Sequence, residues 1–516
     1  MAVKRYKADA DNTIVNTYKS NLETRATGSN TGYADVMEVY SVYGRQNSGS
    51  QELSRILVKF PVSDISTDRT AGDIPVSGSV SFYLRLFNAQ HSKTVPEDYK
   101  LVVAAISKTW EEGVGLDLET YKDDTKGKSG SNWITASAGV AWTAPGGDYL
   151  NSADYVYTQD FSDGLEDVEV NITPLVERWI AGDQTNYGVG VRLSASFEAL
   201  ATAADTSADS SVVTNTAGAT TSYYTKRFFA RGSQYFFKRP VIEARWNSAT
   251  HDDRGNFFYS SSLAPELDNL NTIYFYNYVR GRLQNIPAIG TGEIFVDLYS
   301  GSAADTEPSG GILLQSFDGT LTNPIRTPAT GGYVSTGIYS CSVCITAAAT
   351  PFETLYDVWR GADAAPTQYF TGTISPIVHY AVQTVRKPVY YANITNNRGK
   401  YRNDENARFN VFIREKFWSP TVYTVANSTV EATTIESASY RVYRTIDGFE
   451  AIPHGTGSNL HTLLSYDVSG NYFDFDMSLL QPGYEYAFKF AFYESAVNSW
   501  SEQPETFTFR VEDYEY

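Results

Sequence analysis

The chain has 516 residues, a formal net charge of -18 and a sequence pI near 4.8. At roughly 100 to 200 residues per domain, this length predicts three or four domains, each large enough to bury a core. The acidity argues against binding to nucleic-acid phosphates, because that function needs a basic face. The 38 Tyr and 27 Phe, beside only 3 Met, favour strands over long helices. We therefore expect an acidic, multi-domain chain of the all-β class.

The N-terminal stretch of residues 1–14 is too polar to form the apolar core of a signal peptide. No run of 18 consecutive apolar residues follows, so we expect no membrane span. The only cysteines, Cys341 and Cys344, provide no disulfide framework, which suits assembly in a reducing cytoplasm. They lie three residues apart in an alternating segment, so we expect two buried thiols on opposite faces of one strand.

Short alternating segments bounded by Gly, Ser, Asn and Asp occur through the first 246 residues, for example at 54–61 and 78–87. Short strands at regular spacing predict a jelly-roll sandwich. One helix is expected over 172–182, with Thr173 as its N-cap, Pro174 in its first turn and Gly182 at its end. The Ala/Thr/Ser-rich stretch 199–221 has no such pattern, and we expect a long loop there.

Two further units follow a polar stretch, residues 247–256, that predicts a linker. Expected strands at 272–279 and 292–299 indicate a smaller sandwich over residues 257–386. Expected strands at 407–414 and 440–444 belong to a third unit, residues 387–516. We thus predict a jelly-roll sandwich over residues 1–246, followed by two immunoglobulin-like or fibronectin-like β-sandwich domains.

The segment Leu480-Gln-Pro-Gly-Tyr-Glu-Tyr486 leads into an alternating stretch near the C-terminus. It resembles the tyrosine corner of fibronectin type III and related immunoglobulin-like sandwiches, in which a Tyr hydroxyl bonds back to the preceding turn. Tyr486 would take that structural role. The pattern bears on the fold alone, because such sandwiches host many activities.

Several motifs occur together in the first unit. They are Ala8-Asp-Ala-Asp-Asn-Thr-Ile14, the turn Asn30-Thr-Gly32 before an expected strand at 36–40, the strand at 54–60, Trp110-Glu-Glu-Gly113, Val170-Asn-Ile-Thr173 and Asn186-Tyr-Gly-Val-Gly190. Together they resemble the DNRLRE family of jelly-roll domains, which occurs on microbial surface proteins and is similar to carbohydrate-binding modules. This resemblance covers residues 1–246. It implies, as one reading, an adhesin that recognises a host surface glycan.

The full chain also resembles large virion structural proteins of tailed marine bacteriophages, above all at 409–425 and 480–513. This resemblance implies a structural part of a tail, neck, fibre or capsid decoration, assembled in the host cytoplasm. It implies contacts with other virion proteins and self-association into a homo-oligomer. We take this role as the leading hypothesis and the glycan-binding adhesin as its alternative.

The sequence contains no recognisable catalytic constellation. The five histidines, at positions 91, 251, 379, 454 and 461, form no metal-binding motif, and no nucleophile elbow or phosphate-binding loop occurs at a strand-helix junction. The acidic groups Glu111 with Glu112, Asp123 with Asp124, and Asp163 with Glu166 and Asp167 lie in polar stretches where acids are usually solvated. We expect no enzyme, no cofactor and no dedicated metal site, although loop carboxylates could hold calcium.

Tryptophans could instead form a platform for sugar rings. Trp133 and Trp142 flank a segment, 134–141, that has the composition of a loop, and they are our candidates for glycan contact, with Trp110 nearby in the sequence. Core packing is the alternative for each ring, because an indole buries a large apolar area.

Overall fold

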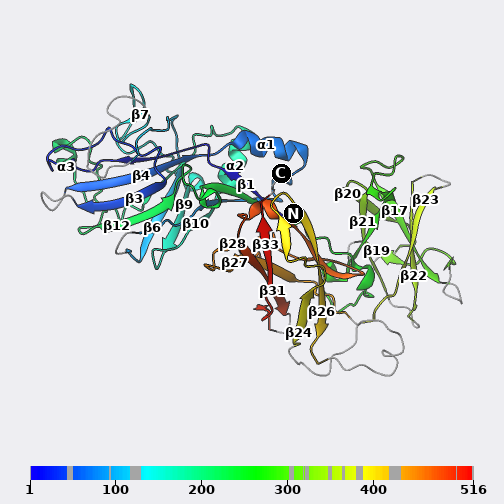
Figure 1. The fold of residues 1–516 in the computed structure, drawn as a ribbon. Coiled ribbons are helices and arrows are strands. Elements are labelled where there is room, and N and C mark those ends of the chain that lie inside the picture. The colour runs from blue at the N-terminus through cyan, green and yellow to red at the C-terminus, as the bar shows by residue number, and fades with distance from the viewer. Residues whose placement is uncertain are drawn as a thin grey trace. The chain divides into compact units, whose positions relative to one another are not determined.

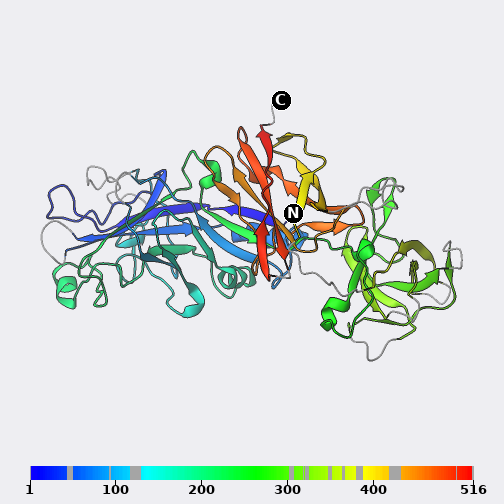
Figure 2. The same ribbon diagram turned by 90° about the horizontal axis from the view of Figure 1, so that it is seen from below.

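The computed structural model describes residues 2–513, except for residues 44–49, 92–94, 117–129, 302–306, 318, 320–324, 347–350, 363–365, 379–387, 418–431 and 495–496. Strands dominate the described residues and helices are short (Figure 1 and Figure 2), which confirms the all-β class. Contacts divide the chain into two compact units, residues 2–247 and 248–516. A further boundary at 387 stays a prediction, and residues 379–387 lie outside the described ranges. No described helix has both the length and the apolar character needed to cross a membrane.

Two antiparallel sheets build the unit of residues 2–247. The smaller has the order β1 (Val3–Lys7), β13 (Val241–Arg245), β5 (Ser81–Leu86) and β10 (Val168–Asn171). The larger has the order β12 (Tyr223–Phe229), β3 (Val36–Tyr43), β4 (Gln51–Lys59), β11 (Val189–Leu193), β6 (Tyr99–Ala105) and β9 (Val156–Phe161), with β2 (Ala10–Val15) also paired to β4. A separate hairpin joins β7 (Thr135–Ser137) and β8 (Val140–Ala141).

Strand β4 is buried on both faces because it lies between two apolar layers. Ile56 and Val58 point into the main core, which the inner faces of both sheets share. Leu53 and Leu57 point to the opposite face, where a second apolar cluster contains Trp133. Successive side chains of a strand alternate between faces, so one strand supplies both clusters.

Helix α2 (Thr173–Ala181) confirms the helix expected over 172–182. Gly182 ends it in the left-handed conformation, with φ of 82°, which glycine adopts without steric cost. The prediction of Thr173 as the N-cap is wrong by one residue, because Ile172 occupies the N-cap position and Thr173 is the first residue of the helix. The Thr173 hydroxyl accepts a hydrogen bond from the Phe82 backbone N–H at 2.7 Å.

Helix α1 (Val62–Ala71) is not apparent from the sequence, because it has no continuous apolar stripe. Only Val62 and Ile65 of this helix are buried. The helix is instead attached to α2 by Arg69, whose two terminal nitrogens each lie 2.7 Å from a carboxylate oxygen of Glu177. Short 3₁₀ turns complete the unit at η1 (Ala153–Tyr155) and η2 (Phe236–Lys238).

The expected long loop at 199–221 contains the short helix α3 (Ala203–Ala208), which corrects that prediction. Thr202 and Asp205 form a reciprocal capping box at its start. Buried Gln51 on β4 holds the segment, since its amide donates to the carbonyls of Ala199 and Val213 and accepts from the Val213 N–H. Local capping and one buried amide therefore order a sequence with few apolar side chains.

One bent sheet occupies the first part of the unit 248–516. Its order is β14 (Asn271–Tyr276), β21 (Ile338–Ile345), β20 (Ala329–Ser335), β17 (Ile294–Gly301), β22 (Leu355–Arg360) and β23 (Gln368–Ile374), with β18 (Pro308–Ser309) on β17 and β19 (Gln315–Ser316) on β21. Strand β20 pairs with β17 through Ala329–Gly331 and with β21 from Gly332 onward. This change of partner lets both halves of the sheet enclose one core. A hairpin of β15 (Tyr278–Val279) and β16 (Arg282–Leu283) stands beside it.

Two sheets face each other in the C-terminal part of this unit. One has the order β24 (Tyr390–Ile394), β26 (Asn406–Glu415), β30 (Gly470–Asp476) and β29 (Ser465–Asp467). The other has the order β25 (Lys400–Arg402), β33 (Phe507–Glu512), β31 (Glu485–Glu494), β27 (Ala438–Arg444) and β28 (Glu450–Ile452), with β32 (Ser499–Glu502) on β31. The remaining turns are η3 (Asp253–Gly255), η4 (Glu266–Asn269) and η5 (Met477–Leu479).

Aromatic rings fill the space between these two sheets. Phe409 of β26 lies 4.9 Å from Phe488 of β31, and Phe473 of β30 lies 4.5 Å from Tyr440 of β27, measured between ring centroids. Tyr486 is buried, donates its hydroxyl proton to the Gln481 carbonyl at 3.0 Å and accepts from the Gln481 N–H at 3.0 Å. These are the hydrogen bonds of the tyrosine corner inferred from the sequence.

The stretch expected to be a linker is folded against two sheets of the unit 248–516. The Arg254 guanidinium makes a two-pronged ion pair with Asp357 of β22, at 2.5 and 2.6 Å. The Tyr466 hydroxyl of β29 donates to Asp253 at 2.6 Å, and the Asp252 N–H donates to the Tyr466 carbonyl. The polar residues that suggest a linker in the sequence therefore form specific bonds to β22 and β29.

We expect Arg254→Met to destabilise this unit by about 3–5 kcal/mol, because it leaves the fully buried Asp357 carboxylate without its cation. Denaturant unfolding followed by tryptophan fluorescence measures the change, since Trp359 also donates to Asp357. The matched control is Arg402→Met. Arg402 pairs with Asp404 where both side chains are more than half exposed, so its loss should cost less than about 1 kcal/mol. Equal effects of the two substitutions would contradict this account.

Candidate functional site

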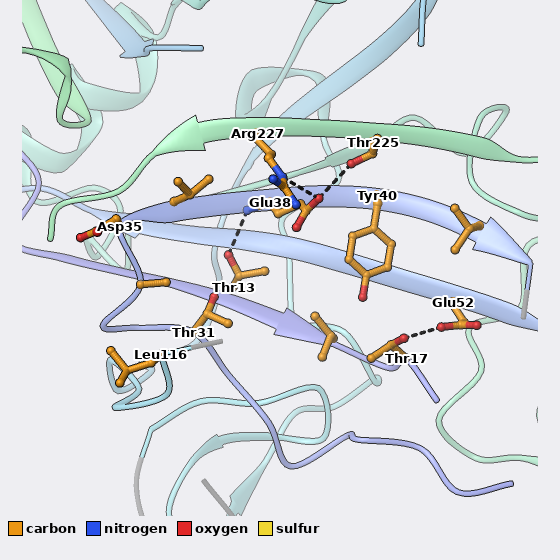
Figure 3. A pocket seen from close by; sticks show the side chains of 14 residues that line it. Thr13, Thr17, Thr31, Asp35, Glu38, Tyr40, Glu52, Leu116, Thr225 and Arg227 are labelled. Atoms are coloured by element: carbon orange, nitrogen blue, oxygen red, sulfur yellow. Dashed lines mark hydrogen bonds and ion pairs between the residues drawn. The ribbon is translucent and has the colours of Figure 1, made fainter. Parts of the chain in front are cut away.

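A pocket of about 660 Å³ opens on the larger sheet of the unit 2–247 (Figure 3). Its walls come from β2, β3, β4 and β12 and from the segments near residues 31–35 and 116. The lining residues are Thr13, Val15, Thr17, Thr31, Ala34, Asp35, Val36, Glu38, Tyr40, Val42, Glu52, Leu116, Thr225 and Arg227. We take this pocket as the candidate functional site.

The pocket forms where the pairing of the sheet changes. Strand β3 pairs with β4 only through Ser41–Tyr43, and β2 takes over the pairing of β4 from Ser54 onward. Two hydroxyl groups then satisfy backbone N–H groups of β3. The Glu38 N–H donates to the Thr13 hydroxyl at 3.3 Å, and the Tyr40 N–H donates to the Ser54 hydroxyl at 2.8 Å. Side-chain oxygens thus replace ladder partners that β3 lacks at this point.

Alternate residues of β3 line the pocket, because every second side chain of a strand points to the same face. Among them, the Glu38 carboxylate accepts from the Arg227 guanidinium at 3.1 Å and from the Thr225 hydroxyl at 3.0 Å, both on the neighbouring strand β12. The ring of Tyr40 extends from β3 toward the β2 side of the pocket (Figure 3). At this end, Glu52 accepts from the Thr17 hydroxyl.

The pocket combines hydroxyl groups with an excess of negative charge. Three carboxylates, those of Asp35, Glu38 and Glu52, face one guanidinium, that of Arg227. Such a surface offers acceptors and donors to a polyhydroxylated ligand and disfavours an anion. Because of the cross-strand bonds, the polar groups are held in place before any ligand arrives.

Glu38 and Glu52 lie at two different places along the pocket wall. Glu52 lies opposite Val42 in the pairing of β4 with β3, and Glu38 precedes Val42 by four residues. About 13 Å of strand therefore separates their backbone positions. Each carboxylate accepts a hydrogen bond from a threonine hydroxyl of the wall, Glu38 from Thr225 and Glu52 from Thr17.

Several residues from the sequence motifs of the first unit meet beside the pocket. The Asn30 side-chain oxygen accepts from the Gly115 N–H at 3.0 Å, and the Asn12 side-chain oxygen accepts from the Thr31 N–H at 3.2 Å. A Cβ atom at Gly113 would lie 1.8 Å from the Asn30 side-chain oxygen, so only glycine fits there. Glu112 forms an ion pair with Arg231 at 2.7 Å. These motif residues support the part of the pocket wall that contains Thr31.

The structure contradicts Trp133 and Trp142 as glycan contacts. Trp133 is 0% exposed and Trp142 is 6% exposed, and both belong to the second apolar cluster, on the outer face of β4. Their indole N–H groups donate to the carbonyls of Ser211 and Asn132, at 2.7 and 2.8 Å. The segment between them is the β7–β8 hairpin and not an open loop. The sequence could not reveal that the larger sheet is covered on both faces here.

Among the other acidic candidates, one is solvated and one caps a turn. Glu111 is exposed, whereas Glu166 accepts from the N–H groups of Ser162 and Asp163, at 2.6 and 3.0 Å. These hydrogen bonds outweigh partial burial and lower the pKa of Glu166 to about 2. Asp123 and Asp124 lie outside the described residues. Within the described ranges, no group of three or more His, Cys, Asp or Glu side chains is arranged to hold a metal ion.

The described histidines pack in separate places. The His251 ring stacks on Tyr466 at 4.8 Å between ring centroids, and His454 lies 3.6 Å from the Glu502 carboxylate. Burial lowers the pKa of both imidazoles. His379 lies outside the described residues.

Sequence reasoning missed the pocket residues Glu38, Tyr40, Thr225 and Arg227. Their alternation along 36–42 and 225–227 is present in the sequence. It becomes a site only through the register that sets Thr225 opposite Tyr40 and Arg227 opposite Glu38. That register joins segments more than 180 residues apart, which a strand pattern alone does not specify.

No protein-family model matches the chain, and no curated protein matches it. Solved structures with weak likeness include a marsupial T cell receptor, with 8% identity over 50% of this chain and 70% of that chain and a TM-score of 0.15. An N-terminal Ig1-2 module of the Drosophila receptor protein tyrosine phosphatase DLAR has 7% identity over 47% and 91%, with a TM-score of 0.13. A DUF4785 family protein from Legionella pneumophila has 9% identity over 98% and 91%, also with 0.13. Likenesses this weak say nothing of a ligand or partner.

Both cysteines are buried in β21 and neither forms a disulfide, as expected. Burial, together with the charge of Asp357, raises the pKa of the Cys341 thiol to about 12. A thiol that stays protonated below this pH is a poor nucleophile, because the thiolate is the reactive form.

We therefore expect Cys341 to resist a thiol reagent such as Ellman's reagent in the native protein, with no gain in labelling between pH 7 and 9.5. Absorbance of the released chromophore in a Cys344→Ala variant measures the labelling of Cys341. Unfolding in denaturant should expose the thiol and allow it to react. Ser342→Cys, on the exposed face of the same strand, is the control that should label in the native state. Labelling of Cys341 as fast as the control would contradict the burial.

Proposed function

We propose that this chain is a structural component of a bacteriophage virion and acts through contacts with other virion proteins and further copies of itself. In the particle it forms part of a tail, neck, fibre or capsid decoration. It is assembled in the host cytoplasm. The resemblance of the full chain to virion structural proteins motivates the proposal. The all-β architecture is consistent with such a role.

An exposed apolar pair is the observation that carries the proposal. Leu263, three residues before η4, is 94% exposed, and Leu267, the second residue of η4, is 78% exposed. A binding partner that covers such exposed apolar side chains gains about 25 cal/mol of binding free energy per Å² of apolar surface removed from water. The pair gives the unit 248–516 a surface suited to a protein partner.

Purified phage particles should contain the chain, and Leu263→Asp should reduce its amount per particle, because a charge opposes burial of that surface. Quantitative mass spectrometry of the particles measures both. Val76→Asp is the matched control: Val76 is 69% exposed and lies in the other unit, so its substitution should leave the amount unchanged. Absence of the chain from purified particles would reject the proposal.

A second candidate function is carbohydrate binding by the pocket on the larger sheet. Its threonine hydroxyls, carboxylates and the Tyr40 ring provide hydrogen bonds and one aromatic face. The DNRLRE resemblance, with its link to carbohydrate-binding modules, motivates the same idea. In this function the chain would act as an adhesin for a host surface glycan.

We expect a glycan array probed with the full chain to give positive spots, and Tyr40→Ala to weaken binding about tenfold through loss of an aromatic contact of about 1.5 kcal/mol. Calorimetry with the best glycan measures the difference. Tyr391→Ala, which removes a tyrosine that is 45% exposed in the other unit, should bind like the parent. A blank array from folded protein would remove this candidate.

A further inference from the structure

Lys226 is a fully buried lysine in the unit 2–247. It lies on β12 and points into the core, where its amine donates to the Asn88 side-chain oxygen at 2.7 Å and to the Gly164 carbonyl at 2.8 Å. The rings of Phe161 and Phe228 flank the amine, with centroids 5.3 and 5.2 Å from it. These contacts hold the amine at one position and keep bulk water away from it.

The backbone holds Asn88 beside Lys226. Asn88 follows β5 and pairs with Phe228 of β12, two residues from Lys226, so the two side chains are diagonal neighbours on one face. Its N–H donates to the Asp167 carboxylate at 2.7 Å, and the flanking Ala89 N–H donates to the Arg227 carbonyl at 3.0 Å. Asp167 is therefore a positioning residue for Asn88.

The amide carbon of Asn88 lies within about 3.9 Å of the Lys226 amine, because a C=O bond adds about 1.2 Å to the 2.7 Å hydrogen bond. Attack distances in reactive complexes are about 3 to 3.5 Å. A side-chain shift of a few tenths of an ångström is thus enough to bring the nitrogen within attack distance of the carbon.

Burial lowers the pKa of Lys226 to about 8, against the charges of Asp167, Glu166 and Asp163, which raise it. At pH 7 about one molecule in ten then carries a neutral amine, whereas a solvated lysine has almost none. The neutral amine is the nucleophilic form. The neutral form of the amine and its position beside the Asn88 amide carbon therefore both favour nucleophilic attack by Lys226.

We propose that Lys226 and Asn88 join in an intramolecular isopeptide bond. The neutral Lys226 amine attacks the side-chain amide carbon of Asn88, a C–N bond forms, and the bond from that carbon to its NH₂ group breaks. The NH₂ group leaves as ammonia with a proton from the amine. The step is neither an oxidation nor a reduction, and it consumes no co-reactant.

Intact-mass measurement of the full chain tests the bond, since the cross-linked protein is lighter than its sequence by one ammonia. Trypsin should then yield residues 86–93 joined to residues 193–227, because the modified Lys226 is no longer a cleavage site. Fragmentation of that species places the bond on Asn88 and Lys226. Full sequence mass, or release of residues 86–93 and 193–226 as separate peptides, would overturn the proposal.

Two substitutions sharpen the test. Asn88→Asp should give a chain lighter than its own sequence by one water in place of one ammonia, because a carboxyl group loses water when it forms the same amide. Lys226→Arg keeps the charge and removes the nucleophile, so it should have its full sequence mass. A deficit of one ammonia that persists in Lys226→Arg would overturn the proposal. Lys100→Arg, at a partly exposed position, should keep the loss.

Discussion

The double burial of β4 is the constraint on which the unit 2–247 depends. A strand covered on both faces needs apolar side chains at successive positions, and β4 provides Ile56 and Leu57 for two different cores. Its one buried cation, Arg55, then requires a partner. The Arg55 guanidinium lies 3.2 Å from the Glu198 carboxylate and also donates to the Gly146 carbonyl. Long connecting segments are thereby fixed to the sheet, and the tryptophans expected at a surface become part of a core.

The same requirement, that buried polar groups have partners, organises the rest of the chain. Gln51 fixes the segment around α3, and Asp357 fixes the segment around Arg254. Thr13 and Ser54 satisfy the backbone of β3 where its ladder to β4 ends. An unpaired buried polar group costs about 1–3 kcal/mol, whereas the whole free energy of unfolding of a domain is only about 5–15 kcal/mol. Polar side chains that look like loop residues in the sequence are therefore structural ones.

Local patterns in the sequence were enough to predict some elements. The helix with Pro174 and Gly182, the tyrosine corner at Tyr486 and the strand that contains Cys341 each depend on neighbouring residues alone. Helix α1 was missed because its stabilising contact is the distant Glu177. The pocket was missed for the same reason, since Arg227 meets Glu38 only through the register of β12 with β3. Long-range strand pairing is therefore the part of the fold that a single sequence does not reveal.

The bond between Lys226 and Asn88 joins the two sheets of this unit covalently. Asn88 lies two residues beyond the end of β5 of the smaller sheet, and Lys226 belongs to β12, the last strand of the larger sheet. Backbone hydrogen bonds already link the two segments, since the Ala89 N–H donates to the Arg227 carbonyl and the Phe229 N–H donates to the Phe87 carbonyl. A covalent link at this place ties the edge of one layer to the other layer, and it stabilises the fold by restricting the unfolded chain, as a disulfide does. Because the link needs no oxidant, it can form in a reducing as well as in an oxidising compartment, whereas a disulfide persists only in an oxidising one.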